Sequence, residues 1–171
     1  QRHCGQTDGA APHHEGRTFG GMDAIDAVQR CGKGFGQGGI PRVYRIRHRD
    51  KTLVIVTDFL EWEPVFEYFL DADFIFVESN HDLELLELYY NPNSRFHSPN
   101  PDTARLLCQA RRHSQRPFGG VMLGHISPQR NRASLALEAA QTAFAENGLA
   151  VDFPLYAAPL REPSETIVIA P

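Results

Sequence analysis

The segment Leu53-Val54-Ile55-Val56-Thr57-Asp58 joins four consecutive large apolar residues to a carboxylate. A second segment, Phe74-Ile75-Phe76-Val77-Glu78, repeats this arrangement further along the chain. Unbroken apolar runs of this length are typical of strands that are covered on both faces. The two segments therefore predict buried strands of a layered sandwich.

Other predicted elements surround these two runs. The polar break Arg49-Asp50-Lys51 separates a segment at 43–47 from the first run, so the two should pair as an antiparallel hairpin. Further strands are expected at 121–123, 151–156 and 166–169, and helices at 64–69, 83–90, 102–113 and 128–147. Asp82 and Ser127 are the predicted helix caps, and Gly148 should end the last helix. This alternation predicts one α/β domain over residues 42–171.

The first 41 residues have a different composition. Ten of the 14 glycines lie before residue 40, and apolar periodicity is almost absent there. We expect residues 1–41 to form an irregular, poorly ordered segment with one short helix at 22–28, which Asp23 can cap.

Composition and charge exclude several classes of protein. The chain has 171 residues and a formal net charge of -4, which excludes a generally basic protein that coats nucleic acid. Its 3 cysteines are widely spaced, which argues against a disulfide scaffold and favours the reducing cytoplasm. No apolar run approaches the roughly 18 residues that a membrane span needs, and residues 1–9 contain no signal-peptide core. We therefore expect a soluble cytoplasmic protein that has no membrane partner.

Ionisable residues follow three of the predicted strands. Asp58 ends the first run, His81 and Asp82 follow the second, and His125 follows the strand at 121–123. The carboxyl ends of strands form a common edge in layered α/β folds, so these four side chains should meet around one cavity. Carboxylate and imidazole groups suit zinc, and they also serve as general acids and bases.

A structural explanation competes at each of these positions. Asp and Asn after a strand are common turn formers, and an Asp directly before Leu83 is a good helix cap. The coincidence of three strand ends favours a functional role for Asp58 and His125, less so for His81, and least for Asp82.

The motifs Thr57-Asp58, Glu78-Ser79-Asn80-His81-Asp82 and Gly124-His125-Ile126-Ser127, in this order, resemble the second half of a metallo-β-lactamase-fold hydrolase. The resemblance covers about residues 42–171 and is closest to the branch that contains nuclease-like and phosphodiesterase-like enzymes. It implies an α/β fold with an αββα-type layered sandwich, of which the amino-terminal half has no counterpart here.

The resemblance also implies roles for single residues. In that family the aspartate matching Asp58 bridges two metal ions, usually zinc with manganese as an alternative, and the histidine matching His125 ligates one of them. The element with His81 and Asp82 lies at the edge of the site in some members. The resemblance therefore implies a catalytic role for this element, in which its histidine passes a proton to the leaving group or binds substrate.

One motif of the family has no match. The loop His-x-His-x-Asp-His, which supplies most ligands of the first metal, is absent from the printed sequence. Two ligands are fewer than the three of an open catalytic zinc site. We expect first that another segment or chain supplies this half; His3, His13 and His14 are a second source, and an inactive site is the third explanation. An uncovered sheet face would then favour self-association, or association with a chain that completes the fold.

The distribution of charge points to the substrate. Residues 103–137 hold six arginines and no acid, among them Arg111, Arg112, Arg116, Arg130 and Arg132. Guanidinium groups bind phosphate through two N–H groups, so Arg112, Arg116 and Arg130 are predicted to bind a phosphodiester or nucleic acid. The alternative is a set of solvated arginines that complement helix ends.

Two functions follow from these observations. The first is a metal-dependent hydrolase of phosphodiester or nucleic-acid substrates, favoured over lactams and thioesters, provided that the missing ligands are supplied. The second is a non-catalytic remnant or binding module that keeps the fold without the metals. The number of metal ligands distinguishes the two.

Overall fold

The two apolar runs form neighbouring parallel strands in the computed structural model, which describes residues 24–28 and 42–169. They belong to a six-stranded sheet in which the strands follow one another in chain order. The first three strands pair antiparallel and the remaining pairs are parallel. The strands are β1 (Ala24–Val28), β2 (Arg42–His48), β3 (Lys51–Thr57), β4 (Phe74–Glu78), β5 (Val121–Gly124) and β6 (Leu155–Ala157).

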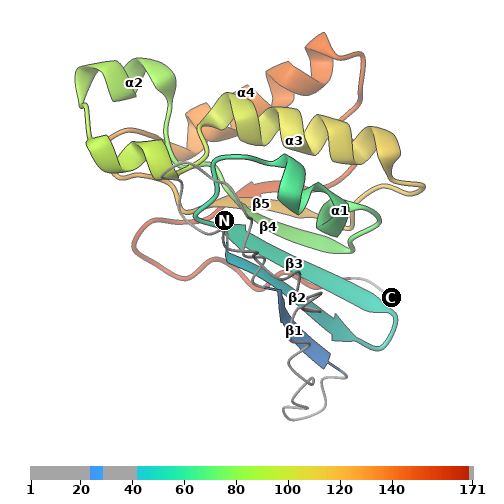
Figure 1. The fold of residues 1–171 in the computed structure, drawn as a ribbon. Coiled ribbons are helices and arrows are strands. Elements are labelled where there is room, and N and C mark those ends of the chain that lie inside the picture. The colour runs from blue at the N-terminus through green and yellow to red at the C-terminus, as the bar shows by residue number, and fades with distance from the viewer. Residues whose placement is uncertain (1–23, 29–41, 170–171) are drawn as a thin grey trace, which may run out of the picture.

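Helices connect the parallel strands and cover one face of the sheet (Figure 1). They are η1 (Glu63–Val65), α1 (Phe66–Phe69), α2 (Leu83–Leu88), η2 (Pro92–Phe96), α3 (Asn100–His113) and α4 (Ala133–Glu146). None of the helices in the described ranges is both long and apolar enough to cross a membrane.

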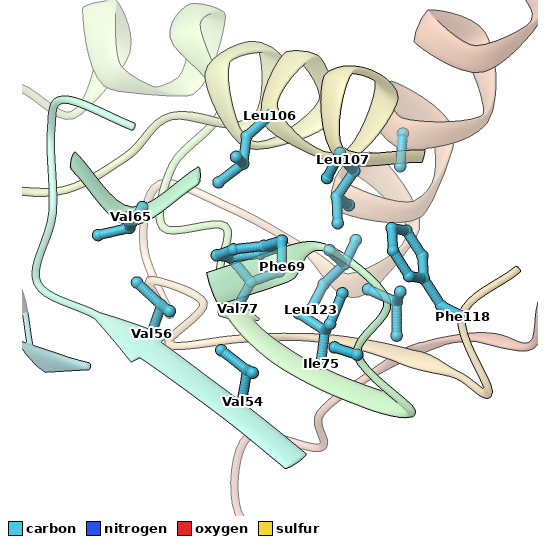
Figure 2. Close-up of a cluster of buried hydrophobic side chains, with 14 of the residues drawn as sticks. Val54, Val56, Val65, Phe69, Ile75, Val77, Leu106, Leu107, Phe118 and Leu123 are labelled. Atoms are coloured by element: carbon cyan, nitrogen blue, oxygen red, sulfur yellow. The ribbon is translucent and has the colours of Figure 1, made fainter. Parts of the chain in front are cut away.

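The main core lies between the sheet and these helices. Val54 and Val56 of β3 point toward α3, as do Ile75 and Val77 of β4, and all four are fully buried (Figure 2). Burying such a side chain contributes about 1.5–3 kcal/mol. The core therefore fixes β3 and β4 with their carboxyl ends side by side.

The opposite face of the sheet carries the alternate residues of the same strands. Leu53 and Ile55 are only half-buried, Tyr44 is exposed, and Phe74 stacks on Tyr156 with ring centroids 6.5 Å apart. No helix of the described ranges packs on this face (Figure 1). The prediction that both runs are covered on both faces is therefore wrong for β3, because its second face is only half-buried.

Most predicted elements are present. The hairpin of β2 and β3, the strands that begin at Phe74 and Val121, and the helices predicted at 64–69, 83–90 and 102–113 are confirmed. The second of these helices ends at Leu88 rather than at residue 90, and the third begins at Asn100. Gly148 ends α4 with a φ of 65°, and the N–H groups of Gly148 and Leu149 donate to the carbonyls of Ala145 and Phe144.

Three predictions for elements in the second half of the chain are wrong. The helix predicted at 128–147 begins only at Ala133, because the Ser127 hydroxyl accepts from the Arg130 N–H at 3.3 Å and stabilises a turn first. The strand at 151–156 is confined to β6, whose start follows Pro154, and residues 166–169 form no strand.

The amino-terminal helix prediction is also wrong. Residues 24–28 are strand β1, which pairs antiparallel with β2. A five-residue segment cannot form a stable helix by itself, whereas the edge of β2 offers it backbone partners. Met22, Asp23, His3, His13 and His14 lie outside the described residues.

Candidate metal centre

Asp58 and His125 follow the carboxyl ends of β3 and β5 and lie side by side. Asp58 Oδ1 is 3.9 Å from His125 Nδ1. Both residues adopt left-handed backbone conformations, with φ of 56° and 53°. Such a conformation is uncommon outside glycine, costs on the order of 1–3 kcal/mol in strained cases, and concentrates at functional sites. The sheet therefore brings two of the predicted ligands together.

His97 is a third member of this cluster, and sequence reasoning missed it. Its Nδ1 lies 3.7 Å from Asp58 Oδ1, and its ring centroid is 5.1 Å from that of His125. The three side chains can place one ligand atom each within 4.8 Å of one another. His97 caps the end of η2 and does not follow a strand. The expectation that functional side chains follow the carboxyl ends of strands therefore identifies Asp58 and His125 but not His97.

Glu78, the last residue of β4, holds both imidazoles. Its Oε1 lies 2.6 Å from His97 Nδ1 and 3.0 Å from His125 Nδ1, while Oε2 accepts from the Phe59 N–H at 3.3 Å. The carboxylate is fully buried. The hydrogen bond with Glu78 raises the pKa of His125. A carboxylate placed in this way fixes the tautomer and the orientation of a histidine ring.

A buried amide fixes the loop that carries His125. The side-chain amide of Asn80 donates to the His125 carbonyl at 2.9 Å, and the Asn80 carbonyl accepts from the Ser127 N–H at 2.8 Å. Asn131, further along the same loop, donates to the Ser79 carbonyl at 2.8 Å. These bonds join the segment after β4 to the loop after β5 and hold His125 in its left-handed conformation.

His81 and Asp82 do not join this cluster. His81 is 4% exposed, and its backbone forms an isolated bridge with Pro99. Burial lowers the pKa of His81, so its imidazole is neutral near pH 7. Asp82 Oδ1 accepts from the Leu85 N–H at 3.0 Å, which makes Asp82 the cap of α2. The structural explanation thus accounts for the contacts of Asp82, and burial keeps His81 from solvent.

The burial of His81 leads to a prediction about pH. Its pKa is lower in the folded state than in the unfolded state, so stability is complete above pH 6.5 and is lost as pH falls toward the folded value. Replacing His81 by Gln should remove this contribution. Thermal unfolding of metal-free protein between pH 7.5 and pH 5 should show a smaller drop in Tm for His81→Gln than for wild type. Parallel curves for the two proteins would contradict the prediction.

The three arginines predicted to bind substrate lie in different places. Arg112 donates to the Asn147 carbonyl at the end of α4, at 2.9 Å. Arg116 donates to Asp73 at 2.9 Å, which precedes β4 and so lies at the opposite end of that strand from Glu78. Arg130 lies on the loop after β5, five residues beyond His125. The structure therefore places only Arg130 on an element that also carries a member of the cluster.

Arg116 is expected to contribute to stability. Asp73 is 3% exposed; burial alone would raise its pKa, but the hydrogen bonds from Arg116 and from the Thr52 N–H lower it. Arg116→Ala should lower the free energy of unfolding by about 1–3 kcal/mol, because the buried carboxylate of Asp73 loses one of its hydrogen-bond donors. Denaturant unfolding would measure this. Metal content should remain unchanged. Arg105→Ala, an exposed arginine paired only with Asp102, is the matched control. Loss of metal without loss of stability would contradict the prediction.

The cluster suits a divalent cation. Asp58, His97 and His125 supply one carboxylate and two imidazoles, which are donors that zinc prefers, in the number that an open catalytic site uses. Glu78 supplies the outer carboxylate that orients such ligands. His97 therefore raises the number of candidate ligands from the two found in the sequence to three.

Comparison with known proteins supports the fold. No family model and no curated protein matches the chain. Among solved structures, the metallo-β-lactamase fold protein YhfI from Bacillus subtilis is similar, with a TM-score of 0.59 and 16% identity over 86% of this chain. The match covers 51% of that protein, so this chain spans about half its length. The predicted α/β, metallo-β-lactamase-like fold class is confirmed.

Proposed function

We propose that this chain carries the metal-binding and catalytic part of a metal-dependent hydrolase. The observation that carries the proposal is the cluster of Asp58, His97 and His125 around the buried carboxylate of Glu78. A divalent cation bound there would polarise an oxygen of the substrate and lower the pKa of a water molecule. Zinc is the favoured metal, with manganese as the alternative, and two ions are expected from the resemblance to the family.

The residues of this chain would hold and orient the reacting groups. Asp58 supplies negative charge to the cation, and the two histidines complete its protein ligands. Glu78 keeps the two rings in place, and Asn80 keeps the His125 loop in place. Hydrogen bonds of 2.6 to 3.0 Å join Glu78 to the two rings and Asn80 to the His125 backbone, so these groups need little reorganisation when substrate arrives.

The substrate is proposed to be a phosphodiester, as in the nuclease-like and phosphodiesterase-like branch, rather than a lactam or thioester. Arg130 supports this choice, because it lies on the loop that begins at His125 and guanidinium groups bind phosphate well. The spacing of the cysteines favours a cytoplasmic location.

The half-exposed face of the sheet is proposed to bind a second apolar surface. Tyr44 is 42% exposed and Tyr156 is 36% exposed, beside the half-buried Ile55 and Phe76. Apolar patches of this kind mark interaction sites. Either a second copy of the chain or a chain that completes the fold and its metal ligands would cover this face.

Hydrolysis after metal exchange tests the function. Protein stripped with a chelator and reloaded with zinc or manganese should bind the metal by elemental analysis and hydrolyse bis(p-nitrophenyl) phosphate. Turnover should exceed that of a chromogenic lactam or a thioester by about tenfold or more, a difference of about 1.4 kcal/mol in activation free energy. A folded protein that binds no metal would favour the non-catalytic binding module, because the loop His-x-His-x-Asp-His is absent from the printed sequence.

A further inference from the structure

An open hollow of about 540 Å³ lies between the end of α2 and the end of the loop after β5. This volume is within the range of pockets that hold a small ligand or one residue of a polymer. Its polar and aromatic lining consists of Tyr89, Tyr90, Asn91, Gln129, Arg130 and Arg132. Two tyrosines and two arginines thus line the same hollow.

The aromatic side is unusually exposed. Leu88, Tyr89 and Tyr90 are 73%, 56% and 77% exposed, and they are consecutive in the chain. The α-helix ends at Leu88, and the Asn91 side chain accepts from the Asn93 N–H at 2.9 Å to start the next turn. The two tyrosines are therefore held at the surface by defined structure on both sides, and α2 itself projects from one end of the molecule (Figure 1).

The cationic side is not neutralised. No carboxylate lines this hollow, whereas the groove between α3 and α4 is lined by Asp82, Glu84, Glu138 and Glu146. Within the described ranges, Arg130 and Arg132 form no ion pair with a carboxylate, and Arg130 Nε is buried without a hydrogen-bond acceptor. The Arg130 guanidinium donates from Nη1 only to a neutral partner, Gln129 Oε1, at 3.2 Å. The two guanidinium groups therefore keep their positive charge, which favours a phosphate in the hollow.

The hollow is close to the candidate metal centre. His125 and Arg130 are five residues apart on one loop, so their Cα atoms are at most about 18 Å apart. The Arg130 carbonyl accepts from the Asp82 N–H at 2.8 Å, and Asp82 follows Asn80 and His81 at the end of β4. A polymer bound in the hollow could therefore reach the cluster of Asp58, His97 and His125.

We propose that this hollow binds single-stranded nucleic acid, with bases stacked on Tyr89 and Tyr90 and phosphates bound by Arg130 and Arg132. The inference rests on the proposed hydrolase function and names its substrate class. Aromatic faces stack on any unpaired base, while bases inside a duplex are already stacked. The unneutralised arginines favour a polyanion over an apolar peptide as the occupant.

Binding without metal tests the inference separately from hydrolysis. Fluorescence anisotropy of a labelled oligothymidylate, with a chelator present, should show binding that weakens steeply with salt. Tyr90→Ala should weaken it about tenfold or more, and Tyr90→Phe should restore it, because stacking needs the ring and not the hydroxyl. Arg132→Ala should weaken binding and reduce the slope against salt. Arg105→Ala, which changes an exposed arginine on another surface, is the matched control.

Several results would overturn the inference. Equal affinity of wild type and Tyr90→Ala, or equal binding of an abasic phosphodiester strand, would remove the stacking role. Absence of oligonucleotide binding in the folded wild type would also overturn it, and specific binding of an acidic peptide instead would assign the hollow to a protein partner. Oligonucleotide binding through Tyr90 by a protein that takes up no metal would contradict the proposed hydrolase and leave this binding site standing.

Discussion

Replacing His97 by alanine is expected to weaken zinc binding by more than about 100-fold. Loss of an outer residue that only orients a ligand costs 10–100-fold in metal affinity, and His97 is proposed to be a ligand itself. The described cluster offers three ligands, so the variant would fall below the number that an open catalytic zinc site uses. Titration against a competing chelator would measure the affinity, and elemental analysis would measure the metal content.

A second variant separates ligation from packing. His97→Ala also removes one of the two imidazoles that contact the buried carboxylate of Glu78, which could destabilise the fold. His97→Gln keeps a donor for Glu78 but not an imidazole, so it should retain the fold and still lose zinc. His113→Ala is the control, because His113 lies at an exposed position, bonds to the Gln109 carbonyl of its own helix and packs edge-to-face on Phe66, without contact to the cluster. Full zinc affinity in His97→Gln would contradict the assignment of His97 as a ligand.

The sequence predicted those parts of the site that follow from the sheet. Asp58 and His125 could be placed together because each follows a buried apolar run, and neighbouring parallel strands bring their ends to one edge. His97 follows an irregular turn, and its position depends on how η2 packs over that edge. No local pattern encodes such packing, so only the structure could add the third candidate ligand.

Other parts of the fold were beyond local patterns for a similar reason. Residues 24–28 carry no strong preference, and the free edge of β2 determines that they form a strand. The start of α4 depends on the side chains of Ser127 and Asn131, which stabilise turns before the helix can begin. Arginine clustering in the sequence suggested one phosphate site, whereas the structure pairs Arg116 with the buried Asp73 and Arg111 with Asp152. The strand at 24–28 and the positions of the arginines thus depend on contacts with residues far away in the sequence, and the start of α4 depends on side-chain hydrogen bonds in the preceding turns.

Glu78→Gln is expected to weaken zinc binding by about 10–100-fold while changing the shape of the side chain very little. Oε1 of Glu78 contacts both imidazoles through Nδ1, and Oε2 accepts from the Phe59 N–H. A glutamine has only one oxygen. In either orientation its NH2 group would face a donor, either the two rings or the Phe59 amide, and one set of hydrogen bonds would be lost. The isosteric change therefore removes both the charge and one acceptor.

The stability of metal-free Glu78→Gln gives an independent readout. Glu78 raises the pKa of His125 in the folded state, so this pair stabilises the protein fully below pH 6.5, and the contribution is lost as pH rises through the raised value. The difference in Tm between wild type and Glu78→Gln should thus be larger at pH 6 than at pH 9. Glu138→Gln, an exposed change on α4, should alter neither zinc affinity nor this pH dependence. Unchanged zinc affinity in Glu78→Gln would contradict the prediction, because it would mean that the two rings keep their positions without the carboxylate that now holds them.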